Sequence, residues 1–347
     1  MEYGSEFDAR ANEAFVRAFP GFLQDDWLLY RSGRDAMKAL ARLVSGRRVL
    51  LPALCCESMI VPFALNGCEV VFYRMREDLR GDEADVRQKL TDGALLLYMP
   101  YFGIRPFTDA FLSALRARGR GVVLAEDRTQ DIVVPRDKEG FTPDATLASL
   151  RKWACLPEGG MLRMALPAEP GRPDSRFGDM RLEAMEEKAE YLSCWEPTLK
   201  QDFLSKLHTA EAMLDEKAEA ACVSEGYRGR LESLDFGAVY QKRLQNIRFL
   251  AEKLEPLRAA GKLRFLTEQP EKSTLYFPLL LEGRDRVQRA LAQQGVYCPV
   301  IWPEPEEAKG VCPVSHNVVE HVLCLPCDQR YTETDMAFFA DCLREAL

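Results

Sequence analysis

Short apolar runs that alternate with helix-like segments constrain the fold of this chain more than any other feature. The strand-sized runs lie at residues 49–52, 69–73, 94–98 and 121–125. The helical patterns lie at residues 33–44, 57–66, 82–90 and 107–118. Because the runs are continuously apolar, we expect strands that are buried on both faces. The sequence therefore predicts an α/β fold with a mostly parallel sheet covered by helices.

The pattern changes after Lys152. A strand is expected at 159–164, and its two glycines indicate a close approach of another backbone. Asp235 is a candidate cap of a long helix that ends near residue 257. The intervening segments are expected to be a Pro/Gly-rich loop at 166–178, charged helices to about residue 221, and an irregular connector at 223–234. The later elements are expected to be strands at 263–266, 274–281 and 321–325 and helices at 284–294 and 332–347.

The shift in composition near residue 234 predicts two domains, and a chain of 347 residues is long enough for both. We expect a large domain at 1–234, which begins with an N-terminal arm over about residues 1–25. A smaller α+β domain is expected at 235–347.

Charge and composition narrow the class of protein. The net charge of −8 argues against binding to nucleic acid. The longest apolar runs fall short of the roughly 20 residues that span a bilayer, so no membrane segment is expected. Eleven cysteines without a secretory signal indicate reduced thiols in the cytoplasm. The cysteines and histidines between residues 312 and 327 do not form two paired ligand clusters, so we predict no metal site.

Lys152 is the strongest candidate for a catalytic residue. It follows an apolar run, and Asp127 or its neighbour Glu126 ends the run before that one. An amine that forms an imine and a carboxylate that keeps a pyridine nitrogen protonated are the groups that pyridoxal-phosphate (PLP) chemistry requires. Both fall where ligands bind in open α/β sheets, at the carboxyl ends of strands. The simpler alternatives are a solvated loop lysine and a capping or surface aspartate.

Other residues are candidates for holding the cofactor. Ser32, Gly33 and Arg34 begin the first long helix, where free N–H groups and the helix dipole favour a phosphate. A simple helix cap with a surface arginine is the alternative. Gln130 is a candidate donor to the phenolate oxygen of the cofactor, and Ser149 is a candidate phosphate ligand or a packing residue.

In their order and spacing these motifs resemble the DegT/DnrJ/EryC1-like aminotransferases, which are fold-type-I PLP-dependent enzymes. The resemblance extends from about residue 30 to the C-terminus. The motifs that carry it are Ser32-Gly33-Arg34, Pro52, Tyr101-Phe102-Gly103, Glu126-Asp127-x-x-Gln130, Ser149-Leu150-Arg151-Lys152, Gly159-Gly160, Arg243-Leu244-Gln245-Asn246 and Leu325-Pro326-x-Asp328-Gln329-Arg330-Tyr331-Thr332.

The resemblance implies specific roles. Lys152 is implied as the lysine that forms the Schiff base and moves protons, Asp127 as the partner of the pyridinium nitrogen, and Gln130 as a neighbouring polar contact. Gly33 and Arg34 match the phosphate-binding turn. A homodimer with active sites at the interface is also implied.

The chain departs from the family at three places, and one is that Ser149 is closer to Lys152 than the matching serine is in the best-known sugar aminotransferases. Arg34 stands where the family has a small hydroxyl residue. Cysteines at positions 55 and 56 stand where an aromatic residue is expected to stack on the cofactor ring. Either Tyr101 or Phe102 covers the ring instead, or the ring is held less tightly.

The predicted reaction is transamination from an amino-acid donor to a keto acceptor, a sugar or another small molecule. Arg330 and Arg128 are candidates for holding the carboxylate of the donor. Two alternatives remain. One is another PLP-dependent reaction, such as a lyase or decarboxylase reaction, and the other is a non-catalytic protein with this fold.

Overall fold

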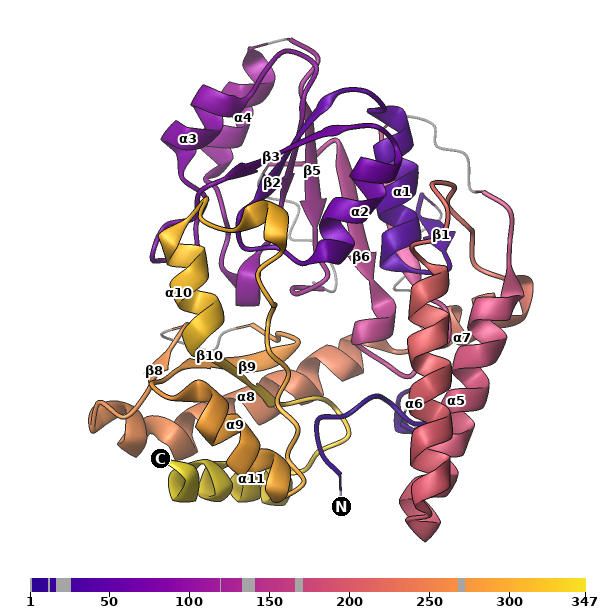
Figure 1. Cartoon of the computed structure of the whole chain (residues 1–347), viewed down its shortest axis with the longest axis vertical. Coiled ribbons are helices and arrows are strands. Elements are labelled where there is room, and N and C mark those ends of the chain that lie inside the picture. The colour runs from indigo at the N-terminus through magenta and orange to yellow at the C-terminus, as the bar shows by residue number, and fades with distance from the viewer. Residues whose placement is uncertain are drawn as a thin grey trace.

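The computed structural model describes residues 2–11, 13–16, 26–118, 120–132, 141–165, 171–267 and 272–347. Figure 1 shows a large sheet flanked by helices and, below it in this view, a smaller sheet with helices of its own. A long pair of helices, α5 and α6, lies beside them. Part of the expected N-terminal arm (1, 12 and 17–25) lies outside the described residues.

The large sheet has seven strands in the order β1-β7-β6-β5-β4-β2-β3. Strands β2 to β6 pair in parallel, whereas β7 runs antiparallel to both of its neighbours. The prediction of a mostly parallel sheet covered by helices is confirmed. The strands are β1 (Leu28–Tyr30), β2 (Arg48–Pro52), β3 (Glu69–Tyr73), β4 (Leu95–Tyr98), β5 (Val123–Asp127), β6 (Ala145–Ser149) and β7 (Gly160–Met164).

The helices of the first half begin where the sequence provides capping side chains. Ser32, Asp82 and Thr108 each accept hydrogen bonds from N–H groups of the first helical turn. Central strand residues such as Leu50 and Leu96 are fully buried, so the sheet is a continuous apolar layer. The helices are α1 (Gly33–Leu43), α2 (Glu57–Leu65), α3 (Glu83–Lys89) and α4 (Asp109–Ala117).

Strand β1 was not expected, because three residues are too few to show a periodic pattern. It pairs with β7, so that Tyr30 lies opposite Gly160. A Cβ atom on Gly160 would lie only 2.0 Å from the carbonyl oxygen of Ser32. The predicted close backbone approach is therefore confirmed at Gly160, and it places the start of α1 against the large sheet.

A helical pair and one short helix connect the two sheets. They are α5 (Ser175–Cys194), α6 (Pro197–Met213) and α7 (Glu225–Glu232). Asp174 caps α5, which therefore begins inside the stretch expected to be a loop. The expected irregular connector at 223–234 is wrong, because α7 lies within it. Ser224 donates to the buried carboxylate of Glu158, and Tyr227 and Leu231 bury their side chains at helical spacing.

The smaller sheet has three antiparallel strands in the order β10-β9-β8. Asp235 accepts a hydrogen bond from the N–H of Ala238 and caps the long helix α8, as expected. Helix α10 was not expected; it occupies the residues just before the last strand. The domain boundary at residue 234 stays a prediction. The elements are α8 (Phe236–Ala259), β8 (Arg264–Phe265), β9 (Tyr276–Leu280), α9 (Arg284–Gln293), α10 (Pro313–His321), β10 (Val322–Pro326) and α11 (Glu333–Ala346).

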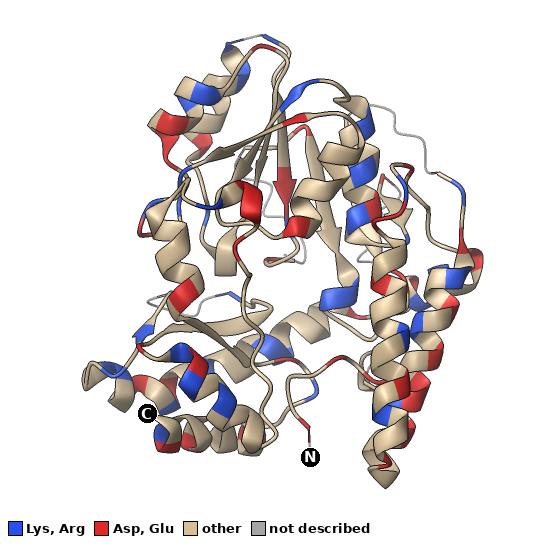
Figure 2. Ribbon diagram, viewed as in Figure 1, with Lys and Arg blue, Asp and Glu red and all other residues tan. Residues whose placement is uncertain are grey.

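The described residues also include four short 3₁₀ helices: η1 (Glu13–Phe15), η2 (Tyr101–Gly103), η3 (Leu150–Lys152) and η4 (Glu306–Ala308). Figure 2 shows acidic and basic residues interspersed along α5, α6 and the helices of the smaller sheet. Within the described ranges, no helix combines the length and the apolar composition needed to cross a bilayer. The same residues contain no cluster of three or more His, Cys, Asp or Glu suited to a metal ion.

Candidate active site

The carboxyl ends of β5 and β6 lie side by side. The two strands pair in parallel, with Asp127 opposite Leu147, and η3 follows β6 directly. The last residue of β5 and the last residue of η3, Asp127 and Lys152, therefore line the same narrow pocket of about 70 Å³. The sequence left the choice between Glu126 and Asp127 open, and in the structure only Asp127 is among the residues that line this pocket.

Asp127 is a buried carboxylate, with 1% of its surface exposed. Burial raises the pKa of Asp127, whereas hydrogen bonds from the side chain and the backbone N–H of Thr129 and the charge of Lys152 lower it, so that the net shift is upward. The N–H bond measures 2.8 Å. A cation placed against this carboxyl group would stabilise its charged form.

The turn that carries Lys152 is fixed by its neighbour Trp153, while the lysine side chain itself is exposed. The indole Nε1 of Trp153 donates to the carbonyl oxygen of Thr129 at 2.7 Å, and the guanidinium of Arg243 lies over the indole ring. The residue before the lysine, Arg151, forms an ion pair of 2.7 Å with Glu211. The backbone of the lysine is thus held on both sides, and its amine is left accessible.

The predicted phosphate turn lies against the end of β6. A Cβ atom on Gly33 would lie 2.8 Å from the Cβ atom of Ser149, so only glycine lets the two backbones approach so closely. The Ser32 hydroxyl caps α1: it accepts from the N–H of Asp35 and donates to the Asp35 carboxylate. Gly33, Arg34 and Ser149 line the narrow pocket together with Lys152.

Glu211 joins three arginines that come from different parts of the chain. It forms ion pairs of 3.0, 2.7 and 2.9 Å with Arg34, Arg151 and Arg181 respectively. Burial raises the pKa of Glu211, but the arginine charges outweigh this effect and hold it at about 2. No local pattern predicted Glu211, because Arg151 and Arg34 lie 60 and 177 positions away from it in the chain.

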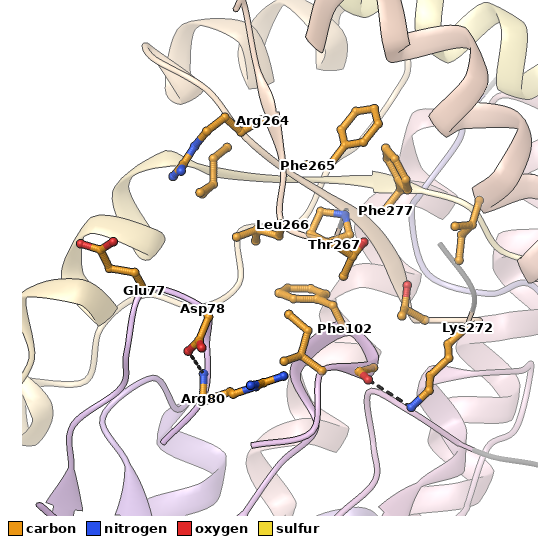
Figure 3. Close-up of a pocket in the computed structure, with 16 residues that line it drawn as sticks. Glu77, Asp78, Arg80, Phe102, Arg264, Phe265, Leu266, Thr267, Lys272 and Phe277 are labelled. Carbon is orange, nitrogen blue, oxygen red and sulfur yellow. Dashed lines mark hydrogen bonds between the residues drawn. The ribbon is translucent and has the colours of Figure 1, made fainter. Parts of the chain in front are cut away.

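Gln130, Tyr101 and Phe102 are outside the set that lines the narrow pocket. Gln130 accepts a hydrogen bond from the N–H of Phe102 at 3.1 Å, and its buried Nε2 has no hydrogen-bond partner among the described residues. Tyr101 is fully buried and donates to the carbonyl oxygen of Leu54. Phe102 instead lines a separate cavity of about 590 Å³ near β8 and β9, which Figure 3 shows. Neither aromatic residue is therefore at the pocket.

The aromatic residue at the narrow pocket is Trp302, which sequence reasoning missed. It lies between α9 and η4, in the C-terminal part of the chain, and lines the pocket together with Asp127 and Lys152. The rings of Trp302 and Tyr101 make an edge contact with centroids 6.3 Å apart. Tyr101 and Phe102, the residues expected to cover the cofactor ring, thus lie outside the narrow pocket, whereas Trp302 lines it. The only sequence signal was its aromatic character in a Pro-containing loop.

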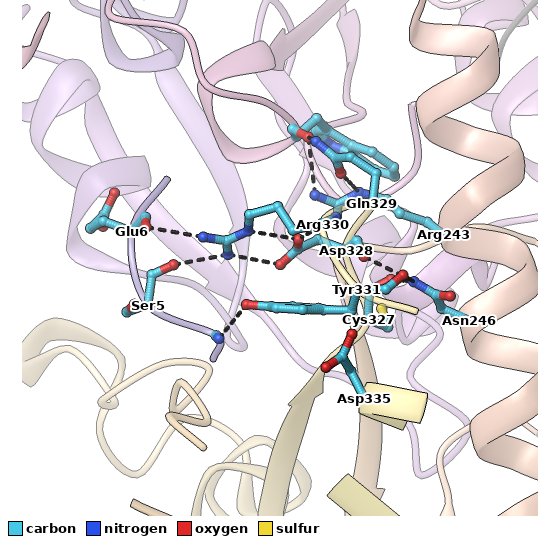
Figure 4. Close-up of polar contacts among 12 residues, drawn as sticks. Ser5, Glu6, Arg243, Asn246, Cys327, Asp328, Gln329, Arg330, Tyr331 and Asp335 are labelled. Carbon is cyan, nitrogen blue, oxygen red and sulfur yellow. Dashed lines mark hydrogen bonds and ion pairs between the residues drawn. The ribbon is translucent and has the colours of Figure 1, made fainter. Parts of the chain in front are cut away.

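A second cavity of about 460 Å³ adjoins the narrow pocket. The two share Arg151, Lys152 and Glu211, so the lysine faces both. Arg330 lines this cavity, but its guanidinium is already paired with Asp328 at 2.8 Å and bound to backbone carbonyls of the N-terminal segment (Figure 4). The other candidate for a donor carboxylate, Arg128, is paired with Asp131 and lines neither space.

Comparison with solved structures identifies the fold. The chain is similar to S. venezuelae DesV in complex with a ketimine intermediate, with a TM-score of 0.66, 18% identity, and coverage of 99% of this chain and 90% of that one. A DegT DnrJ EryC1 StrS aminotransferase from Brucella abortus has a TM-score of 0.59, 17% identity and coverage of 92% and 85%. NtdA from Bacillus subtilis, with bound cofactor PMP, has a TM-score of 0.63, 16% identity and coverage of 92% and 73%.

No protein-family model matches the sequence, and a search of curated proteins gives no match. At such low identities the structural similarity concerns the fold. The chain has the fold of the fold-type-I PLP-dependent aminotransferases, which confirms the fold that the sequence predicted.

Proposed function

We propose that this protein is a PLP-dependent aminotransferase that moves an amino group from an amino-acid donor to a keto acceptor. The observation that carries the proposal is that Lys152 and Asp127 line one pocket at adjacent strand ends. The aminotransferases that share the fold add support, since one is in complex with a ketimine intermediate and another has bound PMP.

The residues at the pocket fit the cofactor. The buried carboxylate of Asp127 suits a protonated ring nitrogen, because a cation there would offset the cost of burial that raises the pKa of this carboxyl group. The close contact at Gly33 provides a backbone turn at a helix N-terminus, which suits a phosphate. The unpartnered Nε2 of Gln130 is a buried donor close to the same strand end.

When bound, PLP supplies an aldehyde that accepts an amino group and an electron-poor ring that stabilises negative charge at the donor α-carbon. Lys152 holds the cofactor through its Nζ atom and then moves the proton at the α-carbon of the donor. Asp127 keeps the ring nitrogen protonated. Arg34, Gly33 and Ser149 hold the phosphate, and Trp302 excludes water from one side of the pocket.

The first test is the visible absorbance of the protein titrated with PLP, followed by borohydride reduction and peptide mass spectrometry. We expect the cofactor to be fixed to the peptide that contains Lys152. The variant Lys152→Ala should lose covalent attachment and turnover, whereas the surface control Lys217→Ala should keep both. Full activity in Lys152→Ala would contradict the role of the lysine.

A screen of amino donors then separates transamination from other PLP chemistry. An aminotransferase converts its bound PLP to the amine form with the donor alone, in stoichiometric amount. Release of carbon dioxide or of an eliminated group would indicate a decarboxylase or lyase. Bound PLP that no donor converts would indicate a non-catalytic protein.

The proposal includes the finer points that the resemblance implies. We propose a homodimer with active sites at the interface and an acceptor that is a sugar or another small keto compound. Light scattering on the purified protein tests the dimer, and the acceptor follows from regenerating the PLP form with keto compounds of different size.

A further inference from the structure

The N-terminal segment Glu2–Asp8, called the arm below, runs along one side of the cavity next to Lys152. Four consecutive arm residues, Gly4 to Phe7, line the 460 Å³ cavity together with Lys152. The arm is therefore part of the enclosure around the catalytic lysine, although it lies about 145 positions earlier in the chain.

Hydrogen bonds attach the arm to the segment after α9 and to the segment between β10 and α11. Tyr3 donates to the carbonyl oxygen of Gly295 and accepts from the N–H of Tyr297, both at 2.9 Å. The N–H of Gly4 donates to the hydroxyl of Tyr331. Gly4 has a φ of +75°, and a Cβ atom there would lie 2.1 Å from the carbonyl oxygen of Tyr297. The path of the arm thus requires glycine at this position.

Two cations, the buried Lys188 and the half-buried Arg330, hold the centre of the arm. Arg330 donates to the carbonyl oxygens of Ser5 and Glu6 while paired with Asp328, as Figure 4 shows. Lys188 on α5 donates to the Ser5 hydroxyl and to the carbonyl oxygen of Glu6. Lys188 lies on α5, and Arg330 lies in the segment after β10. The arm therefore links these two parts of the chain.

The inner end of the arm touches the lysine turn and the cavity wall. Phe7 packs against Cys155, three residues after Lys152, and against Met185 on α5. The Glu6 carboxylate lies 3.9 Å from the guanidinium of Arg181. Phe7 therefore forms part of the apolar wall of the 460 Å³ cavity, and Glu6 adds a negative charge to it.

We propose that the arm is a wall of the substrate cavity and strengthens the binding of the amino donor beside Lys152. This inference rests on the proposed function. With the arm in place, the cavity is bounded on that side, and the Glu6 carboxylate lies beside Arg181. Arg330 then acts by positioning the arm, and the donor contacts the arm residues that line the cavity.

The test compares two glycine variants of the full chain. Gly4→Ala places a methyl group against a backbone oxygen and displaces the arm. Gly261→Ala is the matched control, because Gly261 has a similar φ of +69° but no atom within 4 Å of its added Cβ. Both variants thus share the backbone strain, and only Gly4→Ala moves the arm.

Three measurements are made on the PLP-loaded proteins. L-alanine, L-glutamate and L-glutamine are the donor probes, and loss of the visible absorbance of bound PLP gives the half-saturating donor concentration. PLP affinity comes from titration of the cofactor-free proteins. Alkylation of Cys155, followed by mass spectrometry, reports whether Phe7 still covers this thiol, which is 5% exposed in the native structure.

We expect Gly4→Ala to expose Cys155 and to raise the half-saturating donor concentration about tenfold, with PLP affinity unchanged. Gly261→Ala should match the wild type in all three. Exposure of Cys155 with unchanged donor saturation would overturn the inference. If Gly4→Ala leaves Cys155 protected, deletion of residues 2–7 provides the same comparison. A wild-type protein that fails to bind PLP would instead overturn the proposed function, and the inference with it.

Discussion

Asp127 accepts a hydrogen bond of 2.8 Å from the backbone N–H of Thr129, which fixes a buried carboxylate at the end of β5. The bond compensates only part of the cost of burial, since the pKa of Asp127 remains raised above its usual 3.8. The fold thus retains a buried carboxylate whose charged form lowers the stability of the folded protein. Such a residue is typical of a binding site.

The first prediction is that Asp127→Asn stabilises the cofactor-free protein at neutral pH and weakens PLP binding. In the window between 3.8 and the raised pKa, the folded state binds more protons than the unfolded state. Its stability therefore falls as pH rises through this window, and it stays low above it. Asparagine removes the charge and keeps an oxygen for the Thr129 N–H. Thermal unfolding at several pH values, with and without PLP, measures both effects. A lower melting temperature for the cofactor-free variant would contradict this explanation.

For Glu211 we predict a pH dependence of stability that is opposite to that of Asp127. Its pKa is lowered from 4.5 to about 2, so the stability that it contributes is present above pH 4.5 and is lost as pH falls toward about 2. Glu211→Gln should lower the melting temperature at neutral pH, because three arginines lose their shared carboxylate. The difference from the wild type should shrink below pH 4.5. The exposed Glu186→Gln is the control and should behave as the wild type at every pH.

Gly33 and Gly229 should respond oppositely to the same substitution. Gly33→Ala puts a methyl group 2.8 Å from Ser149, and such overpacking costs about 1–3 kcal/mol. Gly229 lies within α7 with no atom within 4 Å of an added Cβ, so Gly229→Ala should stabilise the protein by about 0.5–1 kcal/mol. Denaturant unfolding of both variants measures the two signs. PLP affinity should fall only in Gly33→Ala, since only this change moves the start of α1.

We expect substitution of Trp302 to weaken PLP binding and to leave the large sheet folded. An aromatic contact is worth about 1 kcal/mol, so Trp302→Ala should raise the Kd for PLP about fivefold, and Trp302→Phe should restore most of the affinity. Trp195, 46% exposed at the end of α5, is the control for loss of an indole. Absorbance titration with PLP measures all three variants. An unchanged Kd in Trp302→Ala would show that the ring does not contact the cofactor.

Local patterns were enough to predict the strand and helix order of the large sheet, because continuous apolar runs and capping residues act over a few residues. The same holds for Lys152 and Asp127, whose place at strand ends follows from that order. Strand β1 and helix α7 were missed for a common reason. Each is stabilised by a distant contact, Tyr30 with Gly160 and Ser224 with Glu158, that no local pattern shows.

The rest of the site also depends on long-range contacts. Glu211 reaches its arginines across 30 to 177 positions of the chain. Arg330 appeared to be a donor-binding residue from its position in a motif, whereas the structure commits it to Asp328 and to the arm. Trp302 enters the pocket from a loop whose path no periodicity describes.

The residues that line the narrow pocket range along the chain from Gly33 to Trp302. During synthesis on the ribosome, the last wall of this pocket is made only after almost the whole polypeptide has emerged. Vitamin B6 capture should therefore come at the end of maturation, and a nascent chain that is stopped before Trp302 should fold its large sheet without retaining the coenzyme tightly.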